Sequence, residues 1–186
     1  ALDWELYRRS HSGLALGFVG LSLMVPMILC TLPAGQLADR ENRKKIILGS
    51  SLVLALSAVG LTLSSALIGL DEKLGLFQTC AYSLLVVIGA GRTFLWPASA
   101  AFVTGLVSRE ELPKAITFNT GAFQLSCVLG PSVAGLLIWL THSAWEVYAV
   151  TSVLGVVAYL LVAGIKHEHK TPPREPVTLK SLVTGF

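Results

Sequence analysis

The charged residues that could do chemistry in this chain gather between two apolar runs. Residues 39–45 read D-R-E-N-R-K-K, after an apolar run that ends at Ala38. Asp39 follows Gly35 by four residues, so the two share one face of a helix. An acid in this basic surrounding needs a partner, such as an arginine or a helix N-terminus. The segment is therefore either a set of charge contacts between helices or a solvated turn that joins them.

A second chemical feature is Arg92, which stands alone in the middle of a long uncharged stretch. If that stretch crosses a bilayer, the buried charge costs about 3 kcal/mol and must face protein or a watery cavity. One reading is a structural arginine satisfied by carbonyls or hydroxyls. The other is a cavity residue that binds an anionic group or tunes a proton-carrying acid. Trp96 and the helix-bending Pro97 follow it, and Asn119 and Gln124 are polar residues in a later apolar run.

Enzyme chemistry finds no support in the residue pattern. Acids are absent from the apolar runs, and the histidines all lie outside them, at positions 11, 142, 167 and 169. The cysteines at 30, 80 and 127 lack the spacing of metal ligands or disulfide pairs. We therefore predict no catalytic site, no metal and no cofactor. The net charge of +3 is explained by the short basic segments, so nothing points to nucleic acid.

The elements that must position these residues are apolar helices. Of the 186 residues, 53% are hydrophobic and 13% are charged, against roughly 25% charged in soluble domains. A bilayer core about 30 Å thick is crossed by roughly 20 apolar helical residues. The gaps between charges predict an all-α membrane protein with five spans, at about 14–38, 46–70, 75–107, 113–140 and 145–165.

The distribution of basic residues predicts which ends of the spans are cytoplasmic. Segments 39–45, 108–114 and 166–186 carry 4, 2 and 4 Lys and Arg, and segments 1–12, 71–73 and 141–146 carry 2, 1 and none. Basic residues collect on the cytoplasmic side of membrane proteins. We therefore expect the 39–45 turn and the C-terminal tail in the cytoplasm.

This topology divides the chain into three parts. Residues 1–13 are an extracytoplasmic lead-in, 14–165 form a partial helical bundle, and 166–186 are a proline-bearing cytoplasmic linker towards a missing second half. A chain that starts outside without a signal peptide leads us to expect an earlier helix, so we predict a fragment truncated at both ends.

The segment from Gly35 to Lys44 resembles the signature loop between the second and third helices of the major facilitator superfamily. Leu37, Ala38, Asp39, Arg40 and Arg43 also match its pattern. Asn42 stands where the family usually has Gly or Pro, and Asn tolerates left-handed backbone. The resemblance implies that the five spans are helices 2–6 of an N-terminal six-helix bundle. It also implies that this loop, with Gly35, Asp39, Arg40, Arg43 and Lys44, acts as a cytoplasmic gate.

A stripe of small residues lies in the predicted span at 113–140. Such a face lets another helix approach closely. It resembles, in part, a Gly-Pro motif of the family's exporters, with a bend at Pro131. Its members are Ser126, Gly130, Pro131, Ala134 and Gly135. Together with the R-E-E-L-P stretch at 109–113, it is similar to a bacterial branch of siderophore exporters and macrolide efflux pumps.

The resemblance implies a function for the chain. We expect a secondary transporter of the bacterial cytoplasmic (inner) membrane that exports a small molecule by alternating access, monomeric at full length. Coupling to a proton gradient, as an antiporter, is implied by the family. Arg92, Trp96, Asn119 and Gln124 are the candidate substrate-cavity or coupling residues. The alternatives are a non-transporting membrane scaffold or assembly subunit and, with less support, a membrane-embedded enzyme.

Overall fold

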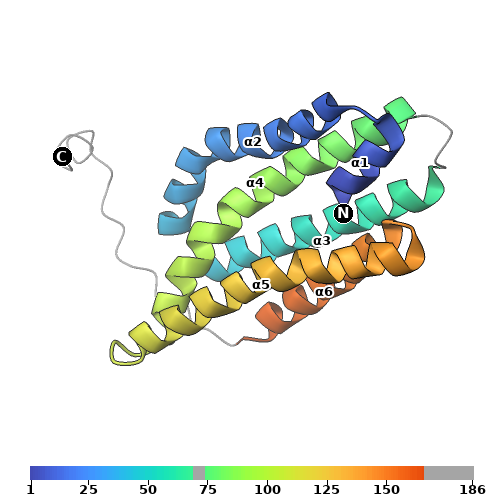
Figure 1. The fold of residues 1–186 in the computed structure, drawn as a ribbon. Helices are drawn as coiled ribbons and strands as arrows, with labels where there is room; N and C mark the ends of the chain where they lie inside the picture. The colour runs from blue at the N-terminus through green and yellow to red at the C-terminus, as the bar shows by residue number, and fades with distance from the viewer. Residues whose placement is uncertain (69–73, 166–186) are drawn as a thin grey trace.

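The structure, a computed structural model, describes residues 1–68 and 74–165, and only the backbone of Asp39 and Arg40. Across these ranges the chain is helical (Figure 1), and the predicted linker at 166–186 lies outside them. The helices are α1 (Leu2–Ser10), α2 (Gly13–Arg40), α3 (Arg43–Leu67), α4 (Leu74–Leu106), α5 (Leu112–Thr141) and α6 (Trp145–Gly164).

Helices α2 to α6 are long and apolar enough to cross a membrane. Each end of these helices lies within three residues of the corresponding end of a predicted span. The long helices run roughly side by side in Figure 1, with successive helices in opposite directions. The chain is thus an all-α bundle of the kind that a bilayer permits, because each helix satisfies its own backbone hydrogen bonds.

The bundle has two ends, which we name by a residue in each. The Asn42 end holds the α2–α3 turn, the α4–α5 connection and the last turn of α6, at the left of Figure 1. The His142 end holds the α1–α2 and α5–α6 turns. There His11 and His142 adopt left-handed backbone, with φ of 49° and 55°. Their N–H groups donate to Tyr7 O and Ile138 O, both at 2.8 Å, which closes α1 and α5.

Helix α4 is the centre of the packing. It lies against α2 on one side and α3 on the other, and α3 also packs along α6. Gly89 makes the α2–α4 contact possible, because a Cβ atom there would lie 2.6 Å from Leu23 O and 2.8 Å from a carbon of Pro26. Across α3 and α6, Gly155 would place a Cβ 3.4 Å from the Cα of Ala55. Small residues therefore set the close helix spacing, as is common in membranes.

Helix α1 is packed into the bundle at the His142 end. Leu6 and Phe77 are both fully buried and join Val19, Ala81 and Leu85 in one apolar cluster. A packed helix was not expected within the predicted lead-in, because residues 1–12 are polar and aromatic, which is typical of a segment at the membrane surface. The structure instead shows α1 packed against α2 and α4.

Helix α5 differs from the other long helices, because within the described structure it buries none of its residues. In the same described ranges no atom lies within 4 Å of a Cβ built at Gly130 or Gly135. Close helix packing at these two glycines is therefore not seen in the described structure, and the role of Ser126, Gly130, Pro131 and Gly135 stays a prediction. The bend predicted at Pro97 also stays one, although Pro97 lies inside α4 and Pro131 inside α5.

Candidate functional site

The α2–α3 turn is built around Asn42. Its side chain accepts a hydrogen bond from Lys44 N at 3.0 Å, and its carbonyl accepts one from Ile46 N at 3.2 Å. Asn42 thus caps the N-terminus of α3. Its backbone is extended, with φ of −64° and ψ of 109°, so the left-handed backbone that Asn tolerates is not used. The residue that departs from the signature pattern closes the turn as a helix cap.

Two basic side chains of this turn tie it to other helices. Arg43 Nη1 donates to Ala101 O of α4 at 3.0 Å. Lys44 Nζ donates to Ala163 O at 2.9 Å and to Ile165 O at 2.6 Å, at the end of α6. The carbonyls at the end of α6 lack intrahelical partners and carry partial negative charge, so the Lys44 cation is favourable there. The turn therefore clamps α3 to α4 and α6 at the Asn42 end.

The other predicted members of this loop lie at the end of α2. Asp39 and Arg40 are the last two residues of α2, and their side chains lie outside the described part. Gly35 is half-buried, and in the described ranges no atom lies within 4 Å of a Cβ built on it. Helix approach at Gly35 and charge contacts of Asp39 and Arg40 remain predictions.

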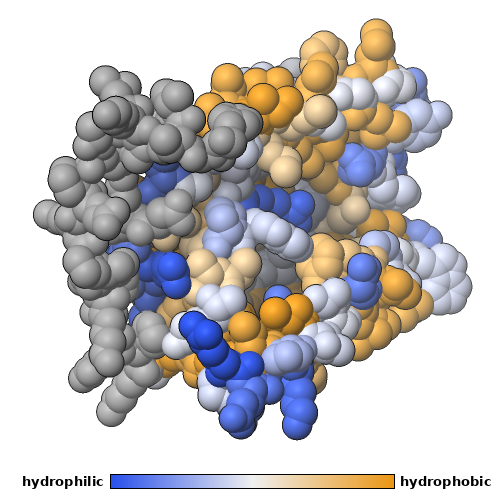
Figure 2. All heavy atoms as spheres, turned by 90° about the vertical axis from the view of Figure 1, so that its left-hand side faces the viewer, coloured by the Kyte–Doolittle hydropathy of each residue, from blue (hydrophilic) through white to orange (hydrophobic). Residues whose placement is uncertain are grey.

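Seen from the Asn42 end, the bundle is polar in places and apolar around them. Figure 2 shows hydrophilic side chains along the lower rim and towards the middle of this face, with hydrophobic ones at the top and right. This pattern fits a helix end that meets water while its sides meet lipid.

Arg92 lies on an exposed face of α4. Within the described structure no hydrogen bond or ion pair to its guanidinium is found. Trp96, one turn further along α4, is 65% exposed and meets Phe123 of α5 edge to face, with ring centroids 5.0 Å apart. The guanidinium is therefore open on the face of α4 that looks towards α5.

The polar residues predicted on α5 lie beside this aromatic contact. Asn119 precedes Phe123 by four residues and shares its helical face, about 6 Å along the axis. Gln124 follows Phe123 directly and points to another face. Both are exposed. The structure thus places Trp96 against Phe123, a residue that the sequence did not single out. Arg92 lies one turn from Trp96 along α4 and Asn119 one turn from Phe123 along α5, and their role, like that of Gln124, stays a prediction.

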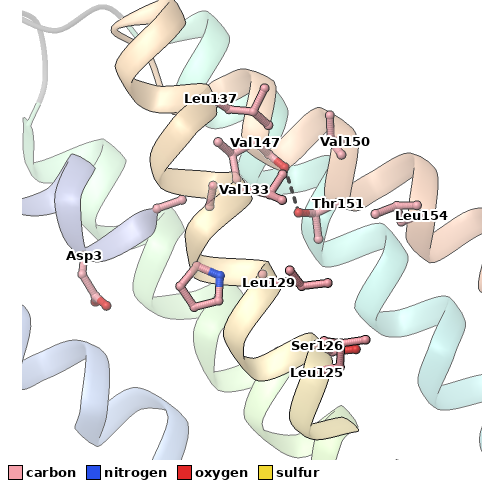
Figure 3. Close-up of a pocket in the computed structure, with 14 residues that line it drawn as sticks. Asp3, Leu125, Ser126, Leu129, Val133, Leu137, Val147, Val150, Thr151 and Leu154 are labelled. Carbon is pink, nitrogen blue, oxygen red and sulfur yellow. Dashed lines mark hydrogen bonds between the residues drawn. The ribbon is translucent and has the colours of Figure 1, made fainter. Parts of the chain in front are cut away.

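A pocket of about 740 Å³ opens between α5 and α6, next to the start of α1. Figure 3 shows side chains of α5 and α6 facing one another across it, with Asp3 on α1 at one side. The walls are mostly apolar. The Thr151 hydroxyl donates a hydrogen bond to Val147 O of the same helix at 2.8 Å. This is a packing groove by its chemistry, and it lies apart from Arg92 and Trp96, which are not among its lining residues.

A buried acid lies at the His142 end, where the sequence predicted no site. Glu5 is 3% exposed and pairs with Arg9, one turn along α1, at 2.6 Å. Its carboxylate also accepts hydrogen bonds from Ser65 Oγ of α3 at 2.7 Å and Tyr148 OH of α6 at 2.8 Å. We call Glu5, Arg9, Ser65 and Tyr148 the α1 cluster. The i, i+4 spacing of Glu5 and Arg9 is visible in the sequence, but it is equally typical of an exposed helix.

Comparisons with known proteins agree with this architecture. The family model described as Major Facilitator Superfamily matches residues 1–185. Macrolide efflux protein A of Streptococcus pyogenes is 28% identical over 169 residues, which is 89% of this chain and 39% of that protein. The homologous macrolide efflux protein A of Enterococcus faecalis is 31% identical over 76% of this chain and 40% of its own length.

A second kind of relative is the enterobactin exporter EntS of Shigella flexneri. It is 29% identical over 100% of this chain and 44% of its own length. The chain therefore spans about two fifths of the length of the curated relatives it matches. With five membrane-length helices, the signature turn between the first two of them and a family match along nearly its whole length, the chain belongs to the Major Facilitator Superfamily.

Proposed function

We propose that this chain is part of a secondary active exporter that moves a small molecule out of the cytoplasm by alternating access. The Asn42 end faces the cytoplasm, the membrane is the bacterial inner membrane, and a proton gradient drives transport. In this proposal α2 to α6 are helices 2–6 of the first six-helix half. The proposal joins the charge distribution of the sequence to the relatives, whose printed names are those of efflux proteins and exporters.

The observation that carries the proposal is the clamp made by Arg43 and Lys44. These side chains bind the carbonyls of Ala101, Ala163 and Ile165, so the signature turn ties α3 to the last third of α4 and to the end of α6. The three contacts from Arg43 and Lys44 are charge-assisted, and a movement of α3 away from α4 and α6 would break them together. A clamp of this kind suits a gate that must close in one state and open in another.

The substrate face in this proposal is the one formed by Arg92, Trp96, Phe123 and Asn119. A guanidinium one turn from an exposed aromatic pair offers a cation beside an apolar surface. This combination suits an amphipathic molecule that carries an anionic or strongly hydrogen-bonding group. The relatives are named for a macrolide and for enterobactin, and we propose molecules of these two classes as the first candidates.

A transport assay tests the proposal. Cells that produce the protein from its intact native gene are loaded with a labelled macrolide or a labelled catecholate siderophore, and efflux is followed with and without an uncoupler. We expect uncoupler-sensitive efflux that falls by about tenfold, the loss of about 1.4 kcal/mol of binding, in Arg92→Ala. Arg109→Ala is the matched control, because Arg109 is an exposed arginine on the α4–α5 connection.

Two results would contradict the proposal. If efflux of both substrate classes equalled that of cells without the gene, the alternative of a non-transporting membrane scaffold would be favoured. Efflux that Arg92→Ala and Arg109→Ala reduce equally would remove Arg92 from the substrate face.

A further inference from the structure

Helix α1 has two faces of opposite character. One face is packed into the bundle and carries Leu6 and the acid and arginine of the α1 cluster. The other face carries Asp3, Trp4, Tyr7 and Arg8, which are all exposed and whose spacing places them on one side of the helix. We call these four residues the outer face of α1. Trp4 and Tyr7 are 38% and 52% exposed, so two aromatic rings lie open beside a cation.

The outer face borders α5 and the pocket between α5 and α6. Arg8 Nη1 donates to His142 O at 2.6 Å, at the residue that ends α5. Ala1 and Asp3 line the pocket, and Figure 3 shows Asp3 on α1 at one side of it. The open rings and the cation are therefore next to a cavity of the bundle.

Arg8 is held in place with most of its donors unused. Its guanidinium lies over the Trp4 ring, 5.0 Å from the centroid, and the bond to His142 O takes one of its five N–H donors. Among the described residues no other acceptor for Arg8 is found. A guanidinium that is already fixed loses little freedom when a carboxylate binds its remaining N–H groups. The arrangement suits an anionic group joined to an aromatic ring, which packs well against Trp4 or Tyr7.

The same pair of residue types occurs on the face that we propose for substrate. There Arg92 and Trp96 lie one turn apart on α4, and here Trp4 and Arg8 lie one turn apart on α1. Both tryptophans are exposed. A molecule with an anionic and an aromatic part thus meets the same chemistry at two places in the bundle.

The pocket spans the stretch of α5 between these two places. Its α5 wall runs from Leu125, two residues after Phe123, to Leu137, about 18 Å along the helix axis. This wall is mostly apolar, so an aromatic molecule beside it stays in contact with apolar surface. On the α1 side Asp3 repels an anion, and Arg8, about 7.5 Å further along α1, attracts it. We therefore expect the anionic group at Arg8 and the aromatic part towards the pocket.

We propose that the outer face of α1 is a second binding station for aromatic anions, where the molecule is held before its release at the His142 end. Arg8 binds the anionic group, and the rings of Trp4 and Tyr7 pack against the aromatic part. The direction of movement and the identity of the molecule as cargo rest on the proposed function. The station itself rests on the contacts of Arg8 and on the exposure of the two rings.

Fluorine NMR tests the station on the protein that is produced from its intact native gene with fluorotryptophan. The resonance of Trp4 is assigned by its loss in Trp4→Phe, and that of Trp96 by its loss in Trp96→Phe. Salicylate, an aromatic carboxylate, is then titrated into the purified protein. The shift of each resonance gives a dissociation constant for the surroundings of that tryptophan, and neither efflux nor a gradient is needed.

We expect both resonances to shift and to reach saturation. Arg8→Gln should raise the dissociation constant reported by Trp4 about tenfold, because a charge-assisted hydrogen bond is lost, and should leave that reported by Trp96 unchanged. Arg92→Gln should have the reverse effect. Arg109→Gln, a change to an exposed arginine on the α4–α5 connection, should alter neither dissociation constant.

Three results would overturn the station. The first is a Trp4 resonance that does not shift, or does not saturate, in the unchanged protein, and this result requires no variant to fold. The second is a dissociation constant at Trp4 that Arg8→Gln leaves unchanged. The third is an equal rise at Trp4 and Trp96 in both Arg8→Gln and Arg92→Gln, which would show one site in place of two.

The station and the proposed function fail separately. A saturating shift at Trp96 alone would overturn the station and leave the Arg92 face as proposed. A lack of efflux in the transport assay would contradict the proposed function and leave the salicylate titration at Trp4 as it is.

Discussion

The indole of Trp96 meets the ring of Phe123 edge to face, with centroids 5.0 Å apart and ring planes at 77°. This contact joins α4 to α5, a helix that buries none of its residues within the described structure. It also sits one turn from Arg92 and one turn from Asn119. The aromatic pair therefore fixes how far α5 stands from the face that we propose for substrate.

The first prediction concerns this pair. We expect Trp96→Ala and Phe123→Ala to be coupled by about 1 kcal/mol in a double-mutant cycle, because edge-to-face pairs stabilise by that order. Thermal unfolding in detergent measures it. Trp139 provides the control, since it lies on α5 with Phe123 and is 69% exposed. The cycle of Trp139→Ala with Phe123→Ala should give no coupling. Equal coupling in both cycles would show that the ring contact is not specific.

The second prediction concerns Lys44. Lys44→Met removes two hydrogen bonds to the last carbonyls of α6 and should lower the free energy of unfolding by about 1 kcal/mol, discounted for a half-exposed charge. Its neighbour Lys45 is exposed, so Lys45→Met should change stability little. Hydrogen exchange of residues 160–165 should increase in the first variant and not in the second. Unchanged exchange in Lys44→Met would contradict the clamp.

The third prediction concerns Gly89 at the α2–α4 contact. A methyl group there would strike Leu23 O, a backbone atom that cannot turn aside. Gly89→Ala should therefore destabilise the bundle by about 1–3 kcal/mol. In contrast, Gly49→Ala on α3, where no described atom lies within 4 Å of the added Cβ, should raise stability by up to about 1 kcal/mol. If Gly89→Ala and Gly49→Ala changed the stability in the same direction, α2 and α4 would not be this close at Gly89.

The sequence was sufficient to predict the spans, because lipid excludes charge and the gaps between charged residues therefore mark the helices. It was also sufficient to identify the Asn42 turn, where residue types and position combine. It was not sufficient for Glu5, since an acid and an arginine four residues apart look the same on an exposed and on a buried helix. Phe123 was missed for a similar reason: a phenylalanine in an apolar run carries no signal until its neighbour on another helix is known.

The central claim of this account is that α2 to α6 cross the membrane with the Asn42 end in the cytoplasm. Labelling single cysteines in intact cells with a membrane-impermeant maleimide tests it most directly, in a chain whose Cys30, Cys80 and Cys127 are alanine. We predict that Lys45→Cys reacts only after the cells are permeabilised, and that Thr141→Cys, exposed at the His142 end, reacts in intact cells. Reaction of Lys45→Cys in intact cells, with Thr141→Cys protected, would reverse the topology and contradict the proposed direction of transport.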